Sequence, residues 1–365
     1  MNVYKKARLP GWLGRTAVAQ VLYGLQPLLI MNRMGAEGKD HMNVCIYGAG
    51  AIGGWIGSAL ARADCRVSVV ARGATLEALQ MHGLRLHRGG SVTSQAVASS
   101  AAPAEFGVQD LVVLAVKAPS LTEVVRNIAQ LIGPRTIVMT AMNGVPWWFL
   151  QGFGGALADT RLTSIDPAGA LTAAIPAQHV IGCVVHASCS VDEPGQVHHH
   201  FGNKLIIGEP SGEPTVRVQQ LAALLEKAGF EASVSEQIQN DIWFKLWGNM
   251  TVNPISALTG ATTDLIMSDE LVRGFISRVM LEAKEIGARL GIAIDQQPED
   301  RHAVTRKLGA FKTSMLQDVE AGKPVELDAL VTAVRELGQL TGVVTPFTDA
   351  LLGLARLQAR RLGLY

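Results

Sequence analysis

The chain has 365 residues, of which 48% are hydrophobic and 17% are charged, so most of it can be buried and two domains are expected. The 32 basic residues nearly balance the 31 acidic residues, which excludes the charge excess that would draw the protein to nucleic acid or to an anionic membrane. We therefore expect a folded protein whose partner is a small molecule.

Residues 1–41 differ in character from the rest of the chain. Basic residues near the start precede a mildly apolar stretch that glutamines and a proline interrupt. This stretch is too polar and too short for stable membrane insertion, and no small-residue cleavage site of a secretory signal is evident. We interpret residues 1–41 as an upstream extension or misplaced start ahead of a fold that begins at Met42. A membrane-surface helix and an extra packed helix are the alternatives.

From Asn43 to about residue 235, short apolar runs alternate with amphipathic segments. The expected strands are 43–47, 66–72, 110–117, 135–144, 180–190, 195–202 and 204–209, and the expected helices are 55–63, 76–83, 121–132 and 215–229. Such alternation predicts a parallel sheet covered by helices on both faces, and the last two strands are candidates for a hairpin.

After residue 235 the remaining segments all have helical spacing, namely 240–250, 269–291, 326–342 and 345–363. We therefore predict an α/β fold in which an N-terminal Rossmann-type, doubly wound parallel sheet (42–235) is followed by an all-α C-terminal domain (236–365).

A glycine-rich turn separates the first expected strand from the first expected helix. Gly48, Gly50 and Gly53 fit the GxGxxG pattern, in which the first glycine makes the turn, the second lets backbone approach a pyrophosphate and the third lets helix pack on strand. Free N–H groups at the start of the helix then bind the anion. The predicted dinucleotide loop comprises Gly48, Ala49, Gly50, Ala51, Ile52 and Gly53.

Arg72 follows the second strand, where an acidic residue would bind the free ribose 2′-hydroxyl of NADH. An arginine at this point is suited to a 2′-phosphate, and one charge-assisted hydrogen bond contributes about 1.5 to 3 kcal/mol. The sequence therefore favours NADP(H) over NAD(H). The alternative is a solvated charge at the end of a strand.

Lys117 and Asn143 each fall just past an apolar strand. In open α/β sheets the carboxyl ends of the strands border the ligand crevice, so both side chains are expected to face the cofactor or the substrate. A structural role in a turn is the alternative for each of them.

Lys245, Asn249 and Asn253 occur at intervals of four in a segment otherwise built from large apolar residues. On a helix this spacing puts the three side chains on one face. Asparagine is unfavourable inside a helix, so we interpret the stripe as a pocket lining in which Lys245 donates a proton and the two amides bind a substrate. Buried asparagines tied to loops are the alternative, and Pro254 argues against regular helix geometry at Asn253.

From about Met42 to Tyr365 the sequence resembles the ketopantoate reductases (2-dehydropantoate 2-reductases). The resemblance rests on "GAGAIGG", "AVK", "NGV", "KLWGNMTVNPISALTG" and "TSMLQDVEAGKPVELDAL". A Lys-x3-Asn-x3-Asn-Pro signature, followed by Ser-Met-Leu-Gln-Asp and by a Glu twelve residues after that Ser, is specific in combination.

The resemblance implies a role for each matching residue. Lys245 would be the general acid, and Glu326 would lie at the nicotinamide end of the cleft, where its carboxylate would help the buried Lys245 to stay charged. The substrate-binding residues implied are Asn143, Asn249, Asn253 and Ser314. The cofactor contacts implied are Asn143, Ala187 and Glu326.

The implied activity is the NADPH-dependent reduction of ketopantoate or a related 2-oxo acid, a step of pantothenate biosynthesis in the cytoplasm; homodimer formation is left open. The alternatives are an NADP(H)-dependent reductase or dehydrogenase of a different hydroxy acid and a non-catalytic NADPH sensor. Trp147 and Trp148, together with a long segment after them, depart from the family pattern, which leaves room for a different 2-oxo acid.

Cysteine and histidine patterns predict neither disulfides nor a metal site. The four cysteines have no CxxC or metal-site spacing and are expected to be free thiols of a reducing compartment. Three consecutive histidines, 198–200, would point to alternating faces of a strand and could not all bind one ion.

Overall fold

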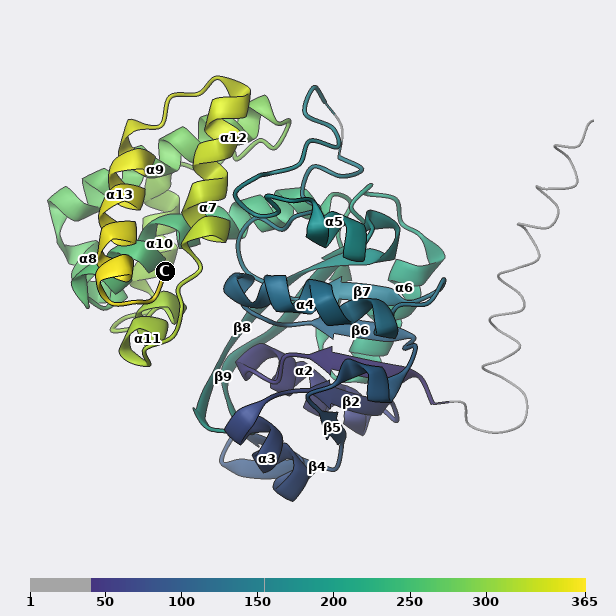
Figure 1. Cartoon of the computed structure of the whole chain (residues 1–365). Coiled ribbons are helices and arrows are strands. Elements are labelled where there is room, and N and C mark those ends of the chain that lie inside the picture. The colour runs from purple at the N-terminus through teal and green to yellow at the C-terminus, as the bar shows by residue number, and fades with distance from the viewer. Residues whose placement is uncertain (1–40, 154) are drawn as a thin grey trace, which may run out of the picture. The chain divides into compact units, whose positions relative to one another are not determined.

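The computed structural model describes residues 41–153 and 155–365. The interpretations of residues 1–40 lie outside this range. Asn43–Tyr365 form one compact unit, in which a sheet with its covering helices is followed by a group of helices (Figure 1).

The sheet contains ten strands. They are β1 (Asn43–Tyr47), β2 (Arg66–Val70), β3 (Leu84–Arg88), β4 (Ser91–Gln95), β5 (Ala98–Ser100), β6 (Leu111–Leu114), β7 (Ile137–Thr140), β8 (Val180–Glu193), β9 (Gln196–Gly208) and β10 (Glu231–Val234). The spatial order is β4-β3-β9-β8-β7-β6-β1-β2-β5, with β10 also paired to β9. All pairs are parallel except β3 with β4 and β8 with β9.

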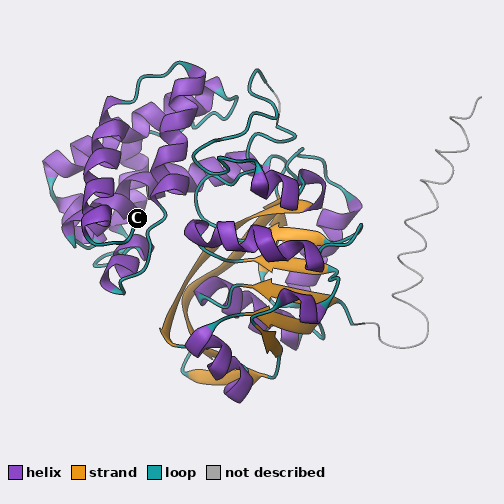
Figure 2. Ribbon diagram, in the orientation of Figure 1, coloured by secondary structure: helices purple, strands orange, loops and turns teal. Residues whose placement is uncertain are grey.

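Helices accompany the sheet and then dominate the C-terminal part (Figure 2). The α-helices are α2 (Ala51–Arg62), α3 (Gly73–His82), α4 (Leu121–Asn127), α5 (Ala170–Ala174), α6 (Val216–Lys227), α7 (Ile238–Thr259), α8 (Thr263–Ser268), α9 (Glu270–Arg289), α10 (Pro298–Arg306), α11 (Ser314–Glu320), α12 (Ala333–Thr341) and α13 (Pro346–Arg361). Short 3-10 turns η1 (Pro103–Phe106), η2 (Ala118–Ser120), η3 (Ile128–Leu131) and η4 (Ala177–His179) and a π-helical turn η5 (Asp328–Thr332) complete the set.

The predicted fold class is confirmed, but strands β3, β4, β5 and β10 were not predicted and the expected hairpin is wrong. Segments 195–202 and 204–209 do not form a hairpin with each other, because both belong to the continuous strand β9. Gly202, at φ +79°, sits at an irregularity in the pairing with β8 and not at a turn. The reversal occurs instead between β8 and β9, where Gly195 has φ +71°.

The histidines of β9 contact different neighbours. His199 stacks on Trp55 of α2 with ring centroids 5.4 Å apart, and His198 stacks on His87 of β3 at 4.3 Å. His200 lies 2.9 Å from the Ser190 hydroxyl of β8. These three rings therefore pack as separate side chains along the strand.

Helix α7 connects the sheet to the C-terminal helices. Its first residue, Ile238, packs against Gly182 of β8, and Trp247 Nε1 farther along donates a 2.7 Å hydrogen bond to the Met280 carbonyl of α9. Contrary to the doubt that Pro254 raised, α7 continues through it to Thr259. The polar stripe consequently lies on one continuous helix.

The hydrophobic core is continuous from the sheet into the helical part, with Trp147, Trp148 and Trp243 among its largest buried side chains. Trp147 and Trp148 are each only 1% exposed, so both indoles act as packing groups and are not available for direct contact with a substrate. In the described part of the chain, no helix combines the length and apolar character of a membrane span. Cys45 and Cys183 are buried free thiols, and Cys65 and Cys189 are free and partly buried.

Candidate active site

Three strand ends supply the sheet side of the site. The parallel strands β1, β6 and β7 are neighbours in the sheet and lead at their carboxyl ends to Gly48, Lys117 and Asn143. Gly48 also approaches the β6 end directly, because a Cβ at this position would lie 2.8 Å from the Ala115 carbonyl oxygen. The loops that the sequence pattern assigned to ligand binding therefore lie along one edge.

The glycines of the loop after β1 serve different purposes. Gly48 has φ +103°, and a Cβ on Gly53 would overlap the Gly48 carbonyl oxygen, so the protein's own packing requires glycine at both positions. Gly50 has an ordinary φ of −74°, and no heavy atom lies within 4 Å of where its Cβ would be. Gly50 thus borders open space at the start of α2, where no side chain caps the N-terminal amides. Open space beside uncapped amides fits a pyrophosphate.

Lys245 of α7 reaches back to the sheet. Its Nζ donates hydrogen bonds to Asn143 Oδ1 at 2.8 Å and to the Val185 carbonyl of β8 at 2.7 Å. Lys245, Asn143 and Asn249 line one small opening. Two acceptors therefore fix the ammonium beside this opening, and a third donor direction of the ammonium remains for another partner.

Burial lowers the pKa of Lys245 to about 8, because desolvation disfavours the charged ammonium. Cys183 and Glu326 oppose this effect, and the Arg301 guanidinium adds to it. The Cys183 thiol is itself neutral at pH 7, since burial raises its pKa to about 12. Glu326 is thus the relevant carboxylate near the ammonium, as its expected role requires.

A second pair of contacts joins the β6 end to the helical part. Lys117 forms an ion pair with Asp318 of α11, and the Ala118 amide donates a 3.1 Å hydrogen bond to Glu326 Oε1. Burial raises the pKa of Glu326, while the Ala118 amide, Lys117 and Lys245 act in the opposite direction. Glu326 therefore lies within electrostatic reach of both lysines of the site.

The remaining residues implied for substrate and nicotinamide surround these contacts less closely. Asn253 is buried on α7, and Ser314 is exposed at the start of α11, which packs against α7. Ala187 lies on β8, two residues after the carbonyl that binds Lys245. No hydrogen bond joins the side chains of Asn249, Asn253 or Ser314 to another described residue, so the assignment of these residues stays a prediction.

Arg72 follows β2 and does not belong to this cluster. The end of β2 lies next to the glycine loop, because the Gly48 amide donates a 3.3 Å hydrogen bond to the carbonyl of Val70, two residues before Arg72. Its guanidinium forms an ion pair with Glu123 of α4, and the two side chains are 62% and 45% exposed. The guanidinium is therefore near the glycine loop and accessible, but it already has an anionic partner.

Sequence reasoning missed several groups of the site. Asp318 belongs to a motif that carried the family resemblance, so the sequence did mark it as a candidate site residue that could pair with Lys117. Nothing in the sequence marked Glu123 as a site residue, because it lies in an ordinary amphipathic helix. The Val185 carbonyl is a backbone group and cannot be identified from residue type.

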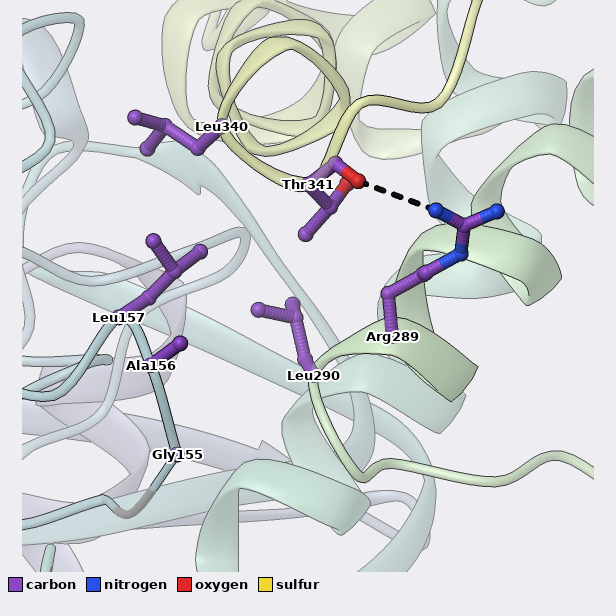
Figure 3. Close-up of a pocket in the computed structure, with 7 residues that line it drawn as sticks. All are labelled: Gly155, Ala156, Leu157, Arg289, Leu290, Leu340 and Thr341. Carbon is purple, nitrogen blue, oxygen red and sulfur yellow. Dashed lines mark hydrogen bonds between the residues drawn. The ribbon is translucent and has the colours of Figure 1, made fainter.

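A larger opening lies elsewhere and does not include these residues. Its lining comes from residues 155–157, from Arg289 and Leu290 at the end of α9, and from Leu340 and Thr341 of α12 (Figure 3). Arg289 is already engaged there, with Nη1 donating to the Thr341 carbonyl and Nε to Glu285. This opening offers none of the proton-donating or phosphate-binding groups described above.

Comparisons with known proteins place this geometry in a family. The family model described as "Ketopantoate reductase PanE/ApbA" matches residues 44–212, and the model of its C-terminal part matches residues 237–359. A 2-dehydropantoate 2-reductase from Mesorhizobium japonicum is 48% identical over 89% of this chain and 100% of its own length. The chain belongs to the ketopantoate reductase family.

Solved structures of family members agree with this assignment. A protein described as a ketopantoate reductase from Ralstonia solanacearum MolK2 is 54% identical, with a TM-score of 0.86 over 89% of this chain and 100% of its own. The 2-dehydropantoate 2-reductase of Geobacter metallireducens GS-15 is 26% identical, with a TM-score of 0.76 over 87% of this chain and 100% of its own.

Two glycine variants of this reductase separate packing from cofactor binding. We expect Gly50→Ala to leave the melting temperature nearly unchanged and to weaken NADPH binding about tenfold or more, because its methyl group enters only the open space beside α2. Gly53→Ala should lower the melting temperature itself, because its methyl group overlaps backbone. Thermal unfolding and fluorescence titration with NADPH would measure both. Equal NADPH affinity in Gly50→Ala and the unmodified protein would contradict the assignment of the loop.

The Arg72–Glu123 pair predicts how the enzyme tells NADPH from NADH. Arg72→Ala should reduce the preference for NADPH about ten- to a hundredfold by removing a charge-assisted contact to the 2′-phosphate. Glu123→Gln should increase the preference, because the carboxylate no longer competes for the guanidinium. The ratio of kcat/KM for the two cofactors is the measurement. A ratio that neither substitution moves would show that Arg72 does not read the phosphate.

Proposed function

We propose that the protein reduces ketopantoate, a 2-oxo acid, to the 2-hydroxy acid pantoate with NADPH. The observation that carries the proposal is the position of Lys245, whose ammonium is held by Asn143 Oδ1 and the Val185 carbonyl beside a small opening. A charged donor in this position suits the protonation of an oxygen that becomes an alkoxide.

The chain's own residues bind and orient the two reactants. Residues 48–53 and the start of α2 would hold the pyrophosphate, and Arg72 would meet the 2′-phosphate. Lys117, Asn143, Ala187 and Glu326 would lie along the nicotinamide end of the crevice. NADPH, when bound, supplies the hydride for the carbonyl carbon.

Lys245 would donate the proton that the carbonyl oxygen needs. The hydrogen bonds to Asn143 and Val185 fix the position of its ammonium before the substrate reacts. The entropy cost of ordering the Lys245 side chain is therefore not part of the reaction barrier. A pKa of about 8 keeps most of the ammonium charged at neutral pH and also makes it a better acid than an exposed lysine. Glu326 would help to retain that charge.

The carboxamides of the stripe would hold the substrate around its reacting carbonyl. Asn249 lines the same opening as Lys245, and Asn253 follows one turn later on α7. Ser314 would close the far side from α11. Amides and a hydroxyl can both donate and accept, which suits a substrate that carries a hydroxyl beside its carboxylate.

A direct assay tests the proposal. NADPH oxidation should be measured with ketopantoate beside a panel of other 2-oxo acids, and the corresponding hydroxy acids should be tested with NADP+ in reverse. Highest kcat/KM for ketopantoate is the expected result. A different preferred acid would favour the related-reductase alternative, and binding of NADPH without turnover of any acid would favour the sensor.

Three further assignments belong to the proposal. We place the domain boundary at residue 235, between the end of β10 at Val234 and the start of α7 at Ile238. The cytoplasm is the proposed compartment, since the four cysteines are free. A homodimer is the proposed assembly, and size-exclusion chromatography with light scattering would test it.

Lys245→Ala should lower kcat about 10² to 10⁴-fold, because a positioned acid contributes roughly that factor. NADPH affinity should change little, since the ammonium binds Asn143 and Val185 and not the glycine loop. Steady-state kinetics and NADPH titration measure the two effects. Lys284→Ala is a matched control, because among the described residues Lys284 of α9 donates only to the Gln296 carbonyl, away from the site. Wild-type turnover in Lys245→Ala would rule out its role as the acid.

The pKa of Lys245 also predicts the pH dependence of the reaction. Reduction requires the protonated ammonium, so kcat/KM for ketopantoate should fall as pH rises through about 8. Oxidation of pantoate requires the neutral amine as base and should rise over the same interval. Initial rates in both directions between about pH 6 and 10 would show the crossing. Two flat profiles would mean that another group transfers the proton.

A further inference from the structure

Arg301 of α10 occupies an unusual position beside the polar stripe of α7. Its Cζ lies 5.7 Å from the centroid of the Phe244 ring, and its guanidinium packs on Gly248, where a Cβ would come within 2.5 Å of Nε. Glycine is less favourable than alanine inside a helix, and here it makes the space that the guanidinium occupies. The helix thus accommodates this arginine at its surface.

The guanidinium has no anionic partner in the described part of the chain. Its Nε–H is buried and donates to no acceptor, and no ion pair involves Arg301 among residues 41–153 and 155–365. The acids of its own helix are already engaged, Glu299 with Arg306 and Asp300 with the Gln297 amide. Burial of a cation without a hydrogen-bond acceptor is unfavourable. The lack of an acceptor around Arg301 therefore indicates that a bound ligand supplies one.

The position of Gly248 puts this guanidinium next to the proposed acid. At about 100° per residue, position 248 lies about 60° around the helix axis from Lys245 and about 100° from Asn249. The guanidinium therefore flanks the polar stripe, within one turn of the lysine. The two cations influence each other, since Arg301 helps to lower the pKa of Lys245.

The surroundings on the sheet side are also cationic. His186 of β8 has its pKa lowered by burial and then by Lys245, Lys204 and Arg301, while Asp241 acts in the opposite direction. The Asp241 carboxylate is already bound by the Ser235 hydroxyl. The three cations Lys245, Lys204 and Arg301 outnumber the two carboxylates nearby, Asp241 and Glu326, so the net charge favours an anion in front of Lys245.

We propose that Arg301 binds the carboxylate of the 2-oxo acid while Lys245 faces its carbonyl oxygen. The proposal rests on the proposed reduction of a 2-oxo acid and adds the group that recognises the acid function. In such a substrate the carboxylate and the carbonyl are joined by a single carbon–carbon bond, so two cations on adjacent flanks of one helix can address both. The planar guanidinium can bind both carboxylate oxygens at once, which the single ammonium of Lys245 cannot do.

Kinetics of Arg301→Met, Arg301→Lys and the control Arg306→Met test the proposal in the full chain. Arg301→Met should raise the KM for ketopantoate about ten- to a hundredfold, with a smaller change in kcat and an unchanged Kd for NADPH. Arg301→Lys should recover part of the loss, because charge returns without the planar fork. Arg306 lies on the same helix and pairs with exposed Glu299, so Arg306→Met should behave as the unmodified protein.

A neutral analogue distinguishes carboxylate binding from simple packing. Ketopantolactone has the same carbon skeleton without a free carboxylate, and the preference of the unmodified enzyme for ketopantoate over this lactone should shrink about tenfold in Arg301→Met. If both compounds lose kcat/KM equally, or if KM for ketopantoate stays within about twofold in Arg301→Met, the proposal is wrong. Should Arg301→Met fail to fold, an unchanged KM in Arg301→Lys overturns it in the same way. An unmodified protein that reduces no 2-oxo acid refutes the proposed function itself, and that result is seen before any variant is compared.

Discussion

The candidate site depends on one constrained ammonium. Lys245 leaves a helix rich in large apolar residues and finds its two acceptors, an amide oxygen and a backbone carbonyl, on the opposite side of the crevice. Burial makes the proton easier to lose, and the nearby Glu326 carboxylate limits that effect. Position and acidity therefore come from the same packing, because any movement that exposed the ammonium to water would relax both.

Contacts between the sheet edge and the helical part hold the two sides of the crevice in fixed positions. Lys117 with Asp318 and the Ala118 amide with Glu326 join consecutive residues of one loop to two neighbouring segments of the helical part. Val145, just past Asn143, donates through its amide to the Ala329 carbonyl of η5. The loops that follow β6 and β7 are thus each tied to the helical part by at least one hydrogen bond, so the two sides of the crevice are positioned together.

The parts that the sequence predicted well are those with a local physical signature. Apolar alternation identified most strands. The GxGxxG turn does lie between β1 and α2, and the four-residue spacing of Lys245, Asn249 and Asn253 does lie on one helix, while the roles of these residues stay predictions. Strands β3, β4, β5 and β10 were missed because their composition is mixed. The expected break between segments 195–202 and 204–209 is absent, because the positive φ of Gly202 only disturbs the pairing with β8 inside one strand. Asp318, Glu123 and the Val185 carbonyl act through partners distant in sequence, which no local pattern reveals.

The sequence separation of the crevice contacts has a consequence for synthesis of the protein. Lys117 and Asp318 are 201 positions apart, and Ala118 and Glu326 are 208 apart. A ribosome that has made only the sheet has produced Lys117 and Ala118, but their acidic partners Asp318 and Glu326 are still untranslated. The contacts that join the two sides of the crevice can therefore form only in the final stage of elongation.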